Sequence, residues 1–145
     1  MDPKLINGNR LYDNRGSLRF SNDLEFKKIK RFYMVNNYNK NFIRAWHGHL
    51  NEEKYIGCIK GTFQISAVRI DNIKKPSKKN KIHNFFLNES NNNFVFIPKG
   101  FANGSMSLEE NSELLIFSTS SINESLKDDV RYNSQYWNPW KINYR

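Results

Sequence analysis

The feature that most constrains the fold is a series of short β-forming runs separated by turn residues. These runs occupy residues 11–20, 27–37, 41–50, 54–71, 83–90, 92–100 and 112–120. Asn, Ser, Pro and Gly stand between them, and Gly57 and Gly61 are expected bends in the longest run. No helical stripe, repeat or linker interrupts the pattern, and only the tail, residues 123–145, lacks strand patterning. The sequence therefore predicts one all-β domain, residues 1–145, with a sandwich, jelly-roll or barrel architecture.

The composition indicates the cellular setting. The 145 residues are enough to bury one hydrophobic core. Cys58 is the only cysteine, so an internal disulfide is excluded, and its β-forming neighbours predict that it faces the core. No apolar run is long enough to span a bilayer, and the N-terminus lacks the apolar segment of a signal peptide. We therefore expect a cytoplasmic soluble protein without a membrane partner.

The charge favours an anionic partner. The formal net charge is +9 and the pI is about 9.7. The densest basic segment, residues 72–81, is broken by Pro76 and indicates a solvated loop. A sheet that binds nucleic acid would interleave basic residues with exposed aromatic ones, whereas the aromatic residues here alternate as core residues do. We therefore expect no nucleic-acid partner.

Two histidines lie one residue apart in the segment RAWHGH, residues 44–49. On a regular strand both imidazoles would face one side, and Arg44 would face the other. Lys54 begins the next run after a short turn. Imidazole carries protons near neutral pH, and a nearby ammonium can stabilise a developing negative oxygen. The pattern suits proton abstraction beside a carbonyl, with a pair of surface histidines in a hairpin as the alternative.

A metal site is a competing interpretation of the same residues. His47 and His49, followed by Glu52 or Glu53, resemble the first metal motif of cupins. The fourth ligand in that motif is a histidine, and the matching position here is Asn103. Asparagine is a weak ligand for a transition metal, which prefers imidazole. We therefore expect no metal and no other cofactor.

Four segments, in order, resemble the dTDP-4-dehydrorhamnose 3,5-epimerase family of sugar-nucleotide enzymes. They are DNRGSL at 13–18, RAWH at 44–47, Lys54 with the Lys60–Gly61 strand end, and IPKGFANG at 97–104. The resemblance covers residues 13 to 118. It implies the all-β cupin fold, a double-stranded β-helix or jelly roll.

The resemblance also implies roles for individual residues. His47 matches the base that removes protons beside the C4 ketone of the sugar, and Lys54 matches the lysine that stabilises the enolate. Arg15 and Arg44 match the arginines that contact the diphosphate, where a guanidinium can hold phosphate oxygens bidentately. The implied function is epimerisation of a nucleotide-diphosphate-linked 4-keto sugar for surface-polysaccharide or lipopolysaccharide precursors. The implied partner is that sugar nucleotide.

The late strand departs from the family at the general acid. The family uses a tyrosine there, and our alignment places Phe117 at this position, where it could contact substrate but not donate a proton. His49 is the nearest substitute as a second acid or base, followed by Tyr55.

Other departures concern the substrate contacts. Asn103 replaces a family histidine, and Phe101 beside it is expected to touch substrate with it, because loops at a barrel mouth often do. Phe20 stands where the family has an acidic contact to thymine, which leaves the nucleotide base open. Asp128 and Asp129 are the candidates for the family's aspartate partner of the base.

A second group of cupins, the sugar-nucleotide 3,4-ketoisomerases, carries an Arg-Gly-x-His-Ala-His motif that RAWHGH also resembles. In that case His47 and His49 would share proton transfer between neighbouring carbons. We favour epimerase over ketoisomerase because of the Gly-Phe-Ala segment and the DDVRY tail. A metal-dependent cupin enzyme and a non-catalytic sugar-nucleotide binder remain as alternatives.

The remaining candidates receive structural roles. Trp137, Pro139 and Trp140 are expected to cover the core or a dimer surface, and His83 to be a packed or edge residue. The resemblance implies a homodimer in which N-terminal strands cross over, and pairing would also protect exposed edge strands.

Overall fold

The computed structural model describes residues 1–140. The strands are β1 (Lys4–Ile6), β2 (Asn9–Asp13), β3 (Gly16–Phe20), β4 (Arg31–Asn37), β5 (Ile43–His49), β6 (Lys54–Lys60), β7 (Thr62–Arg69), β8 (Ile82–Asn88), β9 (Phe94–Ile97), β10 (Phe101–Ser107), β11 (Ser112–Ser118) and β12 (Val130–Arg131). A 3-10 turn, η1 (Phe26–Lys28), precedes β4, and a short helix, α1 (Ile122–Leu126), precedes β12.

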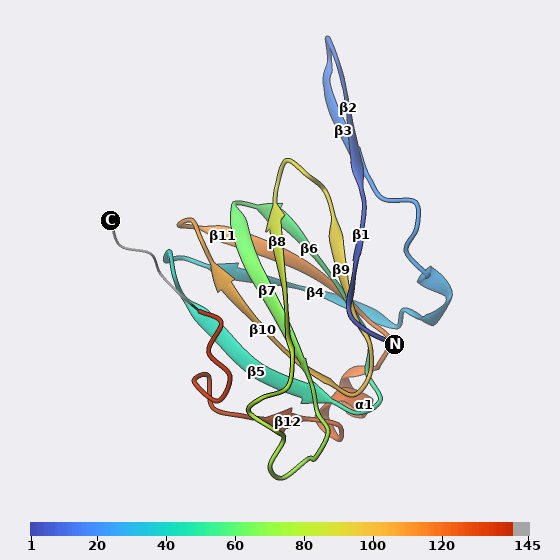
Figure 1. Ribbon diagram of the computed structural model, residues 1–145. Coiled ribbons are helices and arrows are strands. Elements are labelled where there is room, and N and C mark those ends of the chain that lie inside the picture. Colours follow the sequence, from blue (N-terminus) through green and yellow to red (C-terminus); the bar gives the residue numbers. More distant parts are fainter. Residues whose placement is uncertain (141–145) are drawn as a thin grey trace.

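Two antiparallel sheets make up the body of the molecule (Figure 1). Over residues 1–140, one sheet has the order β1-β9-β6-β11-β4 and the other β12-β5-β10-β7-β8. Apolar side chains from the facing sides of both sheets form one core, including Ile56, Phe63, Leu87 and Leu114. Alternate side chains of each strand face this core, which explains the period-2 pattern of the sequence and is the arrangement of a jelly roll. The predicted all-β fold is confirmed.

The two glycines of the longest run have different roles. Gly61 has a φ of +77° and forms the turn from β6 to β7, as predicted. The prediction of a bend at Gly57 is wrong, because Gly57 lies inside β6. A Cβ at this position would come within 2.5 Å of the Phe94 ring. Gly57 therefore serves close packing of an aromatic ring and not a change of direction.

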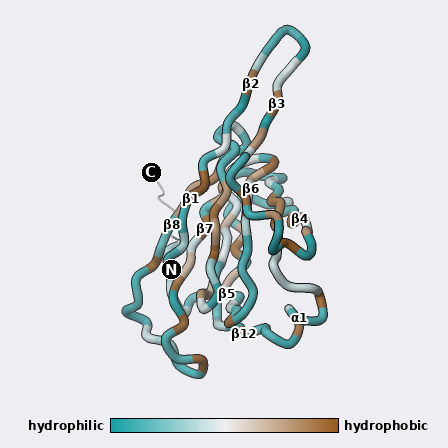
Figure 2. Tube along the Cα trace, turned by 90° about the vertical axis from the view of Figure 1, so that its right-hand side faces the viewer, coloured by the Kyte–Doolittle hydropathy of each residue, from teal (hydrophilic) through white to brown (hydrophobic). Residues whose placement is uncertain are grey.

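The hairpin of β2 and β3 projects from the body (Figures 1 and 2). Its side chains include the exposed Leu11, Tyr12 and Leu18. Arg15 lies in its turn and pairs with Asp13, with the guanidinium Nη2 2.7 Å from Oδ2. Apolar side chains exposed on a projecting hairpin are typical of a surface that contacts another molecule.

The C-terminal tail forms structure that its sequence did not predict. Trp46 on β5 is 1% exposed and packs against Trp137 and Trp140, with ring centroids 5.4 and 5.3 Å away. The indole Nε1 of Trp46 donates a hydrogen bond of 3.0 Å to the carbonyl of Trp137. The prediction that Trp137 and Trp140 cover the core is confirmed, and their packing holds the tail against β5.

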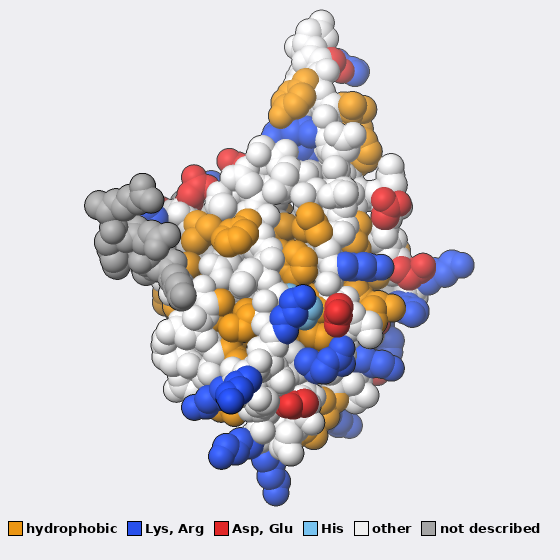
Figure 3. Space-filling view, in the orientation of Figure 1, with side chains coloured by type: hydrophobic (Ala, Val, Ile, Leu, Met, Phe, Trp, Pro, Cys, Tyr) orange, Lys and Arg blue, Asp and Glu red, His pale blue; other side chains and the backbone are white. Residues whose placement is uncertain are grey.

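The basic segment 72–81 forms an exposed loop between β7 and β8, as predicted. Lys74, Lys75, Lys78, Lys79 and Lys81 are all exposed. Figure 3 shows basic side chains at the end of the molecule that this loop forms. Pro76 and the aromatic rings of the tail anchor the loop, with the Trp137 Nε1 donating 3.0 Å to the carbonyl of Ser77.

Candidate active site

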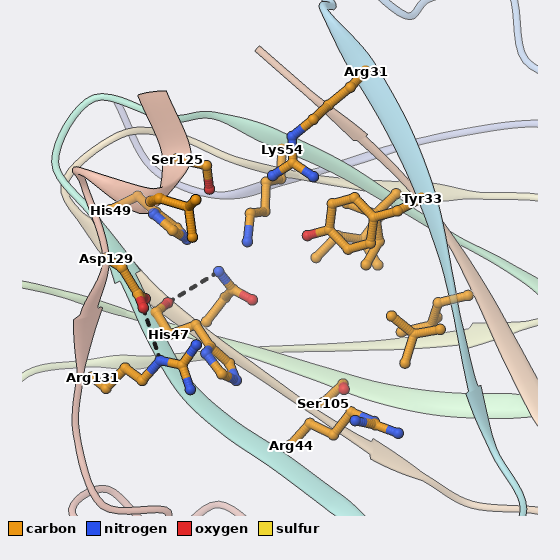
Figure 4. Close-up of a pocket in the computed structure, with 16 residues that line it drawn as sticks. Arg31, Tyr33, Arg44, His47, His49, Lys54, Ser105, Ser125, Asp129 and Arg131 are labelled. Carbon is orange, nitrogen blue, oxygen red and sulfur yellow. Dashed lines mark hydrogen bonds and ion pairs between the residues drawn. The ribbon is translucent and has the colours of Figure 1, made fainter. Parts of the chain in front are cut away.

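A cavity of about 280 Å³ opens between the two sheets, and polar groups from both converge on it (Figure 4). Its floor is apolar and comes from Val35, Ile56, Leu114 and Ile116. The other lining residues are Arg31, Tyr33, Arg44, His47, His49, Lys54, Asn103, Ser105, Ser125, Leu126, Asp129 and Arg131. An apolar floor with a few convergent polar groups is the usual form of a small-molecule site.

An irregularity in β5 brings Arg44 to the same cavity as the histidines. Asn103 pairs with His47 and Ser105 with Arg44, so β5 uses one residue more than β10 over this interval. Such a bulge changes the direction of the side chains that precede it. The expectation that Arg44 faces away from the imidazoles assumed a regular strand and is wrong. The Nε of Arg44 is held by Oδ1 of Asn37 at 2.7 Å.

His47 lines the cavity from the middle of the β5–β10 pair. Burial lowers its pKa from the ordinary value of 6.5, and the positive charges of Lys54 and Arg131 lower it further. Asp129, which binds the Nε of Arg131 at 3.0 Å, opposes this effect in part. The Nδ2 of Asn103 donates a hydrogen bond of 3.2 Å to the carbonyl of His47. The imidazole is therefore neutral at pH 7, as a base must be.

His49 is more buried than His47 and has a defined tautomer. Its Nδ1 lies 2.8 Å from the carbonyl oxygen of Asp128. A carbonyl only accepts hydrogen bonds, so Nδ1 carries the hydrogen and Nε2 is the nitrogen that gains or loses a proton. Burial is the main cause that lowers the pKa of His49, and Lys54 adds to it.

Asp128 fixes the turn that follows the histidines. Its carboxylate accepts hydrogen bonds from the backbone N–H groups of Leu50, Asn51 and Glu52 at 2.8, 2.9 and 3.0 Å. The candidates for an acidic partner of the base thus have separate roles: Asp128 holds this turn and His49, and Asp129 is the carboxylate whose charge acts on His47.

Lys54 enters the cavity at the start of β6. Its Nζ lies 3.4 Å from Oε2 of Glu52 and 6.0 Å from the centre of the Tyr33 ring. The structure therefore brings together His47, His49, Lys54, Arg44 and Asn103 out of the residues predicted from sequence.

Three predicted residues lie elsewhere. Arg15 is on the projecting hairpin, with 86% of its side chain exposed. Phe101 is 1% exposed and packs in the core, so it does not line the cavity. Phe117 faces the outer side of its sheet, where it stacks on Phe94. The placement of Phe117 at the general-acid position is wrong, because the alternation of β11 turns Ile116 toward the cavity.

Sequence reasoning missed Tyr33. The hydroxyl of Tyr33 points into the cavity, and the guanidinium of Arg31 lies 4.8 Å from its ring centre (Figure 4). Tyr55, the predicted substitute acid, packs on Phe96 on the other face of β6. The signal for Tyr33 was present as alternation, since Arg31, Tyr33 and Val35 share one face of β4. The apolar Phe32 and Met34 lie on the opposite face of β4, which is exposed.

The carboxylate in the predicted metal motif faces cations. The carboxylate of Glu52 lies 3.6 Å from Arg31, 3.6 Å from His49 and 3.4 Å from Lys54. Two fixed cations around a carboxylate oppose the binding of a third. Among residues 1–140, no group of three or more His, Cys, Asp or Glu residues is arranged to hold a metal ion.

Fold and site together define a cupin with a polar, cation-lined cavity, and comparisons with known proteins identify its family. Residues 2–143 match the profile of the dTDP-4-dehydrorhamnose 3,5-epimerase family. The chain belongs to this family. No curated protein matched the sequence.

Solved structures show the same fold. The dTDP-4-dehydrorhamnose 3,5-epimerase of Bacillus anthracis, solved with TDP and PPi bound, is 18% identical with a TM-score of 0.79, over 99% of this chain and 87% of that one. A 3,4-ketoisomerase from Helicobacter canadensis is 24% identical with a TM-score of 0.71, over 94% and 95%. A mutant 3,4-ketoisomerase from Thermoanaerobacterium thermosaccharolyticum, in complex with TDP-4-keto-6-deoxyglucose, is 20% identical with a TM-score of 0.70, over 93% and 91%.

The part of the chain that the structure describes contains no helix with the length and apolar character needed to cross a membrane.

Proposed function

We propose that this protein is an epimerase of a nucleotide-diphosphate-linked 4-keto sugar, and that it starts the reaction by removing a proton beside the ketone. The observation that carries the proposal is the convergence of His47, Lys54 and Tyr33 on one cavity next to Arg44. The family match and the TDP-sugar complex of a structural neighbour support the substrate class.

His47 is the proposed base. Its neutral imidazole takes a proton from the carbon next to the ketone, and the electron pair moves onto the ketone oxygen. Lys54 places an ammonium in the cavity, where it stabilises this enolate oxygen. The positive charge of Lys54 has two effects: it lowers the pKa of His47, which keeps the base neutral, and it stabilises the negative oxygen of the enolate.

Tyr33 is the proposed proton donor for inversion. It comes from β4, and His47 comes from β5 in the other sheet, so a sugar between them presents different sides to the two groups. A proton removed on the His47 side and returned on the Tyr33 side inverts the carbon. His47 then releases its proton to solvent, and Tyr33 regains one from solvent.

The cationic side chains at the edge of the cavity are the proposed binding site for the diphosphate. Arg44 and Arg131 are exposed at its edge, and Asn103 adds an amide beside them. An anionic diphosphate at these groups would account for part of the net charge of +9 without a nucleic-acid or membrane partner.

Ketoisomerisation is a second candidate, and the presence of His49 in the same cavity as His47 favours it. An imidazole that delivers the proton to the neighbouring carbon would move the ketone and invert no centre. The two reactions share the first step and differ in the carbon that receives the proton.

We further propose that the protein is a single-domain, cytoplasmic enzyme whose product is used in surface-polysaccharide precursor synthesis.

We also propose that it is a homodimer. The projecting hairpin exposes Leu11, Tyr12 and Leu18 and carries Arg15, which would reach the cavity of a second copy. Equilibrium sedimentation should give twice the chain mass. Mixed dimers of Arg15→Ala and His47→Asn chains should recover activity that neither variant shows, and no recovery would refute a shared site.

Solvent deuterium incorporation tests the reaction. The protein and a His47→Asn variant are incubated in D2O with dTDP-, GDP- and UDP-linked 4-keto sugars, and the ring protons are followed by NMR. We expect exchange at C3 or C5 with the wild type and none with the variant. The product separates epimerase from ketoisomerase. Saturable binding without exchange of any sugar would refute catalysis and indicate a binding protein.

A further inference from the structure

Glu52 is a buried carboxylate to which the proposed reaction assigns no role. It lies in the turn between β5 and β6, and its side chain has no exposed surface. Neither carboxylate oxygen accepts a hydrogen bond from any group in residues 1–140. Burying a carboxylate without hydrogen bonds is costly, so the charges around it must stabilise it.

Three basic groups from three strands surround this carboxylate. The Nη2 of Arg31 lies 3.6 Å from Oε1, while Nε2 of His49 and Nζ of Lys54 lie 3.6 and 3.4 Å from Oε2. Lys54 is 7% exposed, and Glu52 is its ion-pair partner in the described part of the chain. The carboxylate thus links the proposed oxyanion holder to the second imidazole.

The position of the His49 hydrogen decides what Glu52 can do. Nδ1 donates to the Asp128 carbonyl, so the ring gains or loses its proton at Nε2, beside Glu52. A negative charge at this distance favours the protonated ring. The other titratable groups near His49 are Lys54, His47 and the Asp128 carboxylate, whose Oδ2 is 4.0 Å from Nδ1.

Within residues 1–140, no carboxylate forms an ion pair with His47 as Glu52 does with His49. The groups around it are Lys54, Arg131, Asp129 and His49, and the cations among them disfavour its protonation more strongly than Asp129 favours it. Two imidazoles one residue apart on β5 therefore have unlike neighbours. Unlike environments of neighbouring titratable groups separate the acid from the base.

We propose that Glu52 is a positioning residue that holds Lys54 in the cavity and offsets part of the effect of burial on His49, so that the two imidazoles of β5 differ in how easily they are protonated. This inference rests on the proposed function. It keeps His47 as the base, distinguishes His49 from it by its carboxylate neighbour, and gives the buried Glu52 a role in the site.

Histidine titration by NMR tests this proposal without substrate. The chain has three histidines, so 15N-histidine labelling gives few signals to assign. In Glu52→Gln, which keeps shape and removes charge, the pKa of His49 should fall by about one unit or more, whereas that of His47 should change less. Glu53→Gln is the matched control, because the neighbouring Glu53 carboxylate accepts from the Lys99 N–H outside the cavity. An unchanged His49, or an equal shift in the control, would overturn the proposal.

A wild-type measurement keeps the proposal testable if Glu52→Gln does not fold. The 15N shifts of neutral His49 should be those of the Nδ1–H tautomer, with Nε2 as the titrating nitrogen. The Nε2–H tautomer would contradict the proposal. Glu52→Asp, which keeps the charge, should retain part of the His49 shift.

Activity separates this inference from the proposed function. In Glu52→Gln, kcat should fall with little change in KM, because Lys54 loses the carboxylate that holds its ammonium in the cavity. If the wild type exchanges no sugar proton but His49 responds to Glu52, the proposed function fails and the electrostatic coupling stands. If the wild type is active and His49 does not respond, only the role of Glu52 fails.

Discussion

The guanidinium Nε of Arg44 donates a hydrogen bond of 2.7 Å to the side-chain oxygen of Asn37. Asn37 is 2% exposed, and its own Nδ2 donates to the Ser107 hydroxyl at 3.2 Å. A buried amide that is itself fixed by β10 thus orients an exposed cation at the cavity edge. Arg44 is therefore preorganised for a ligand and does not lose much side-chain freedom on binding one.

Replacing Asn37 tests this orientation. We expect Asn37→Ala to weaken dTDP binding about tenfold, because Arg44 loses one charge-assisted hydrogen bond worth ~1.5 kcal/mol. Isothermal titration calorimetry measures this. Asn36→Ala is the control, since Arg44 meets residue 36 only through its backbone carbonyl, 3.4 Å from Nη2. Equal affinity in wild type and Asn37→Ala would show that Arg44 needs no such support.

Tyr33 and Tyr55 provide a matched pair for the proton donor. Tyr33→Phe should reduce epimerisation by about 10²-fold or more, because a general acid contributes at least that much. Deuterium exchange at the carbon that His47 deprotonates should survive, since deprotonation does not require the phenol. Tyr55→Phe, on the outer side of β6, should keep full activity. If only Tyr55→Phe lost activity, the proton donor would lie on the face of β6 that points away from the cavity, and the proposed site would be refuted.

The contrast between these two tyrosines shows how far the sequence predicts the site. The prediction that His47, His49 and Lys54 face one cavity is confirmed, because a short turn carries the chain from β5 in one sheet to β6 in the other. Tyr33 was missed because period-2 alternation tells which residues share a face but not which face is inside. Phe32 and Met34 are the more apolar set, yet they are the exposed one.

Local irregularities account for other differences. The direction of Arg44 depends on a bulge in β5, which results from pairing with β10 and leaves no mark in the sequence of β5 alone. Phe117 and Ile116 differ by one residue, and a shift of one position exchanges the two faces of a strand. Glu52 was considered only as a metal ligand, since its cationic neighbours Arg31 and Lys54 come from two different strands.

The pH dependence of activity follows from His47. Its pKa lies below 6.5 in the folded protein because of burial and the charges of Lys54 and Arg131. The base is thus still neutral at pH 6.5, and the acid limb of kcat/KM should fall below that pH. Arg131→Gln should move this limb to higher pH, because it removes a repulsive charge. An acid limb above pH 6.5 in the wild type would exclude His47 as the base.

The same shift affects stability. Unfolded histidines bind protons with a pKa near 6.5, whereas His47 and His49 bind them at lower pH when folded. Between these values the unfolded state holds more protons, so the free energy of unfolding should decrease as the pH falls below about 6.5. Urea unfolding at several pH values measures the slope, and it should be shallower in His47→Asn. A steeper slope in the variant would contradict the direction of the shift.

Cys58 should be unreactive in the folded protein. It is 4% exposed in the core, and burial raises the pKa of its thiol to about 12. The thiolate is the reactive form, so at pH 8 iodoacetamide should modify the chain only after unfolding in guanidinium chloride. Mass spectrometry counts the adducts. Rapid modification of the native protein would mean that this part of the core opens readily.

Trp46 should dominate the attachment of the C-terminal tail. Trp46→Phe removes the hydrogen bond to the Trp137 carbonyl and part of the contact with Trp140. We expect the free energy of unfolding to decrease by ~2–4 kcal/mol, from the lost packing volume and an unsatisfied buried carbonyl. Phe86→Leu on β8, where the side chain is 61% exposed, should change it by less than ~0.5 kcal/mol. Because the tail carries Asp129 and Arg131 to the cavity, and Asp128 to His49, before it reaches Trp137, both His47 and His49 should also titrate differently in Trp46→Phe. Unchanged titration with reduced stability would show that the residues around β12 hold their positions without the tryptophan cluster.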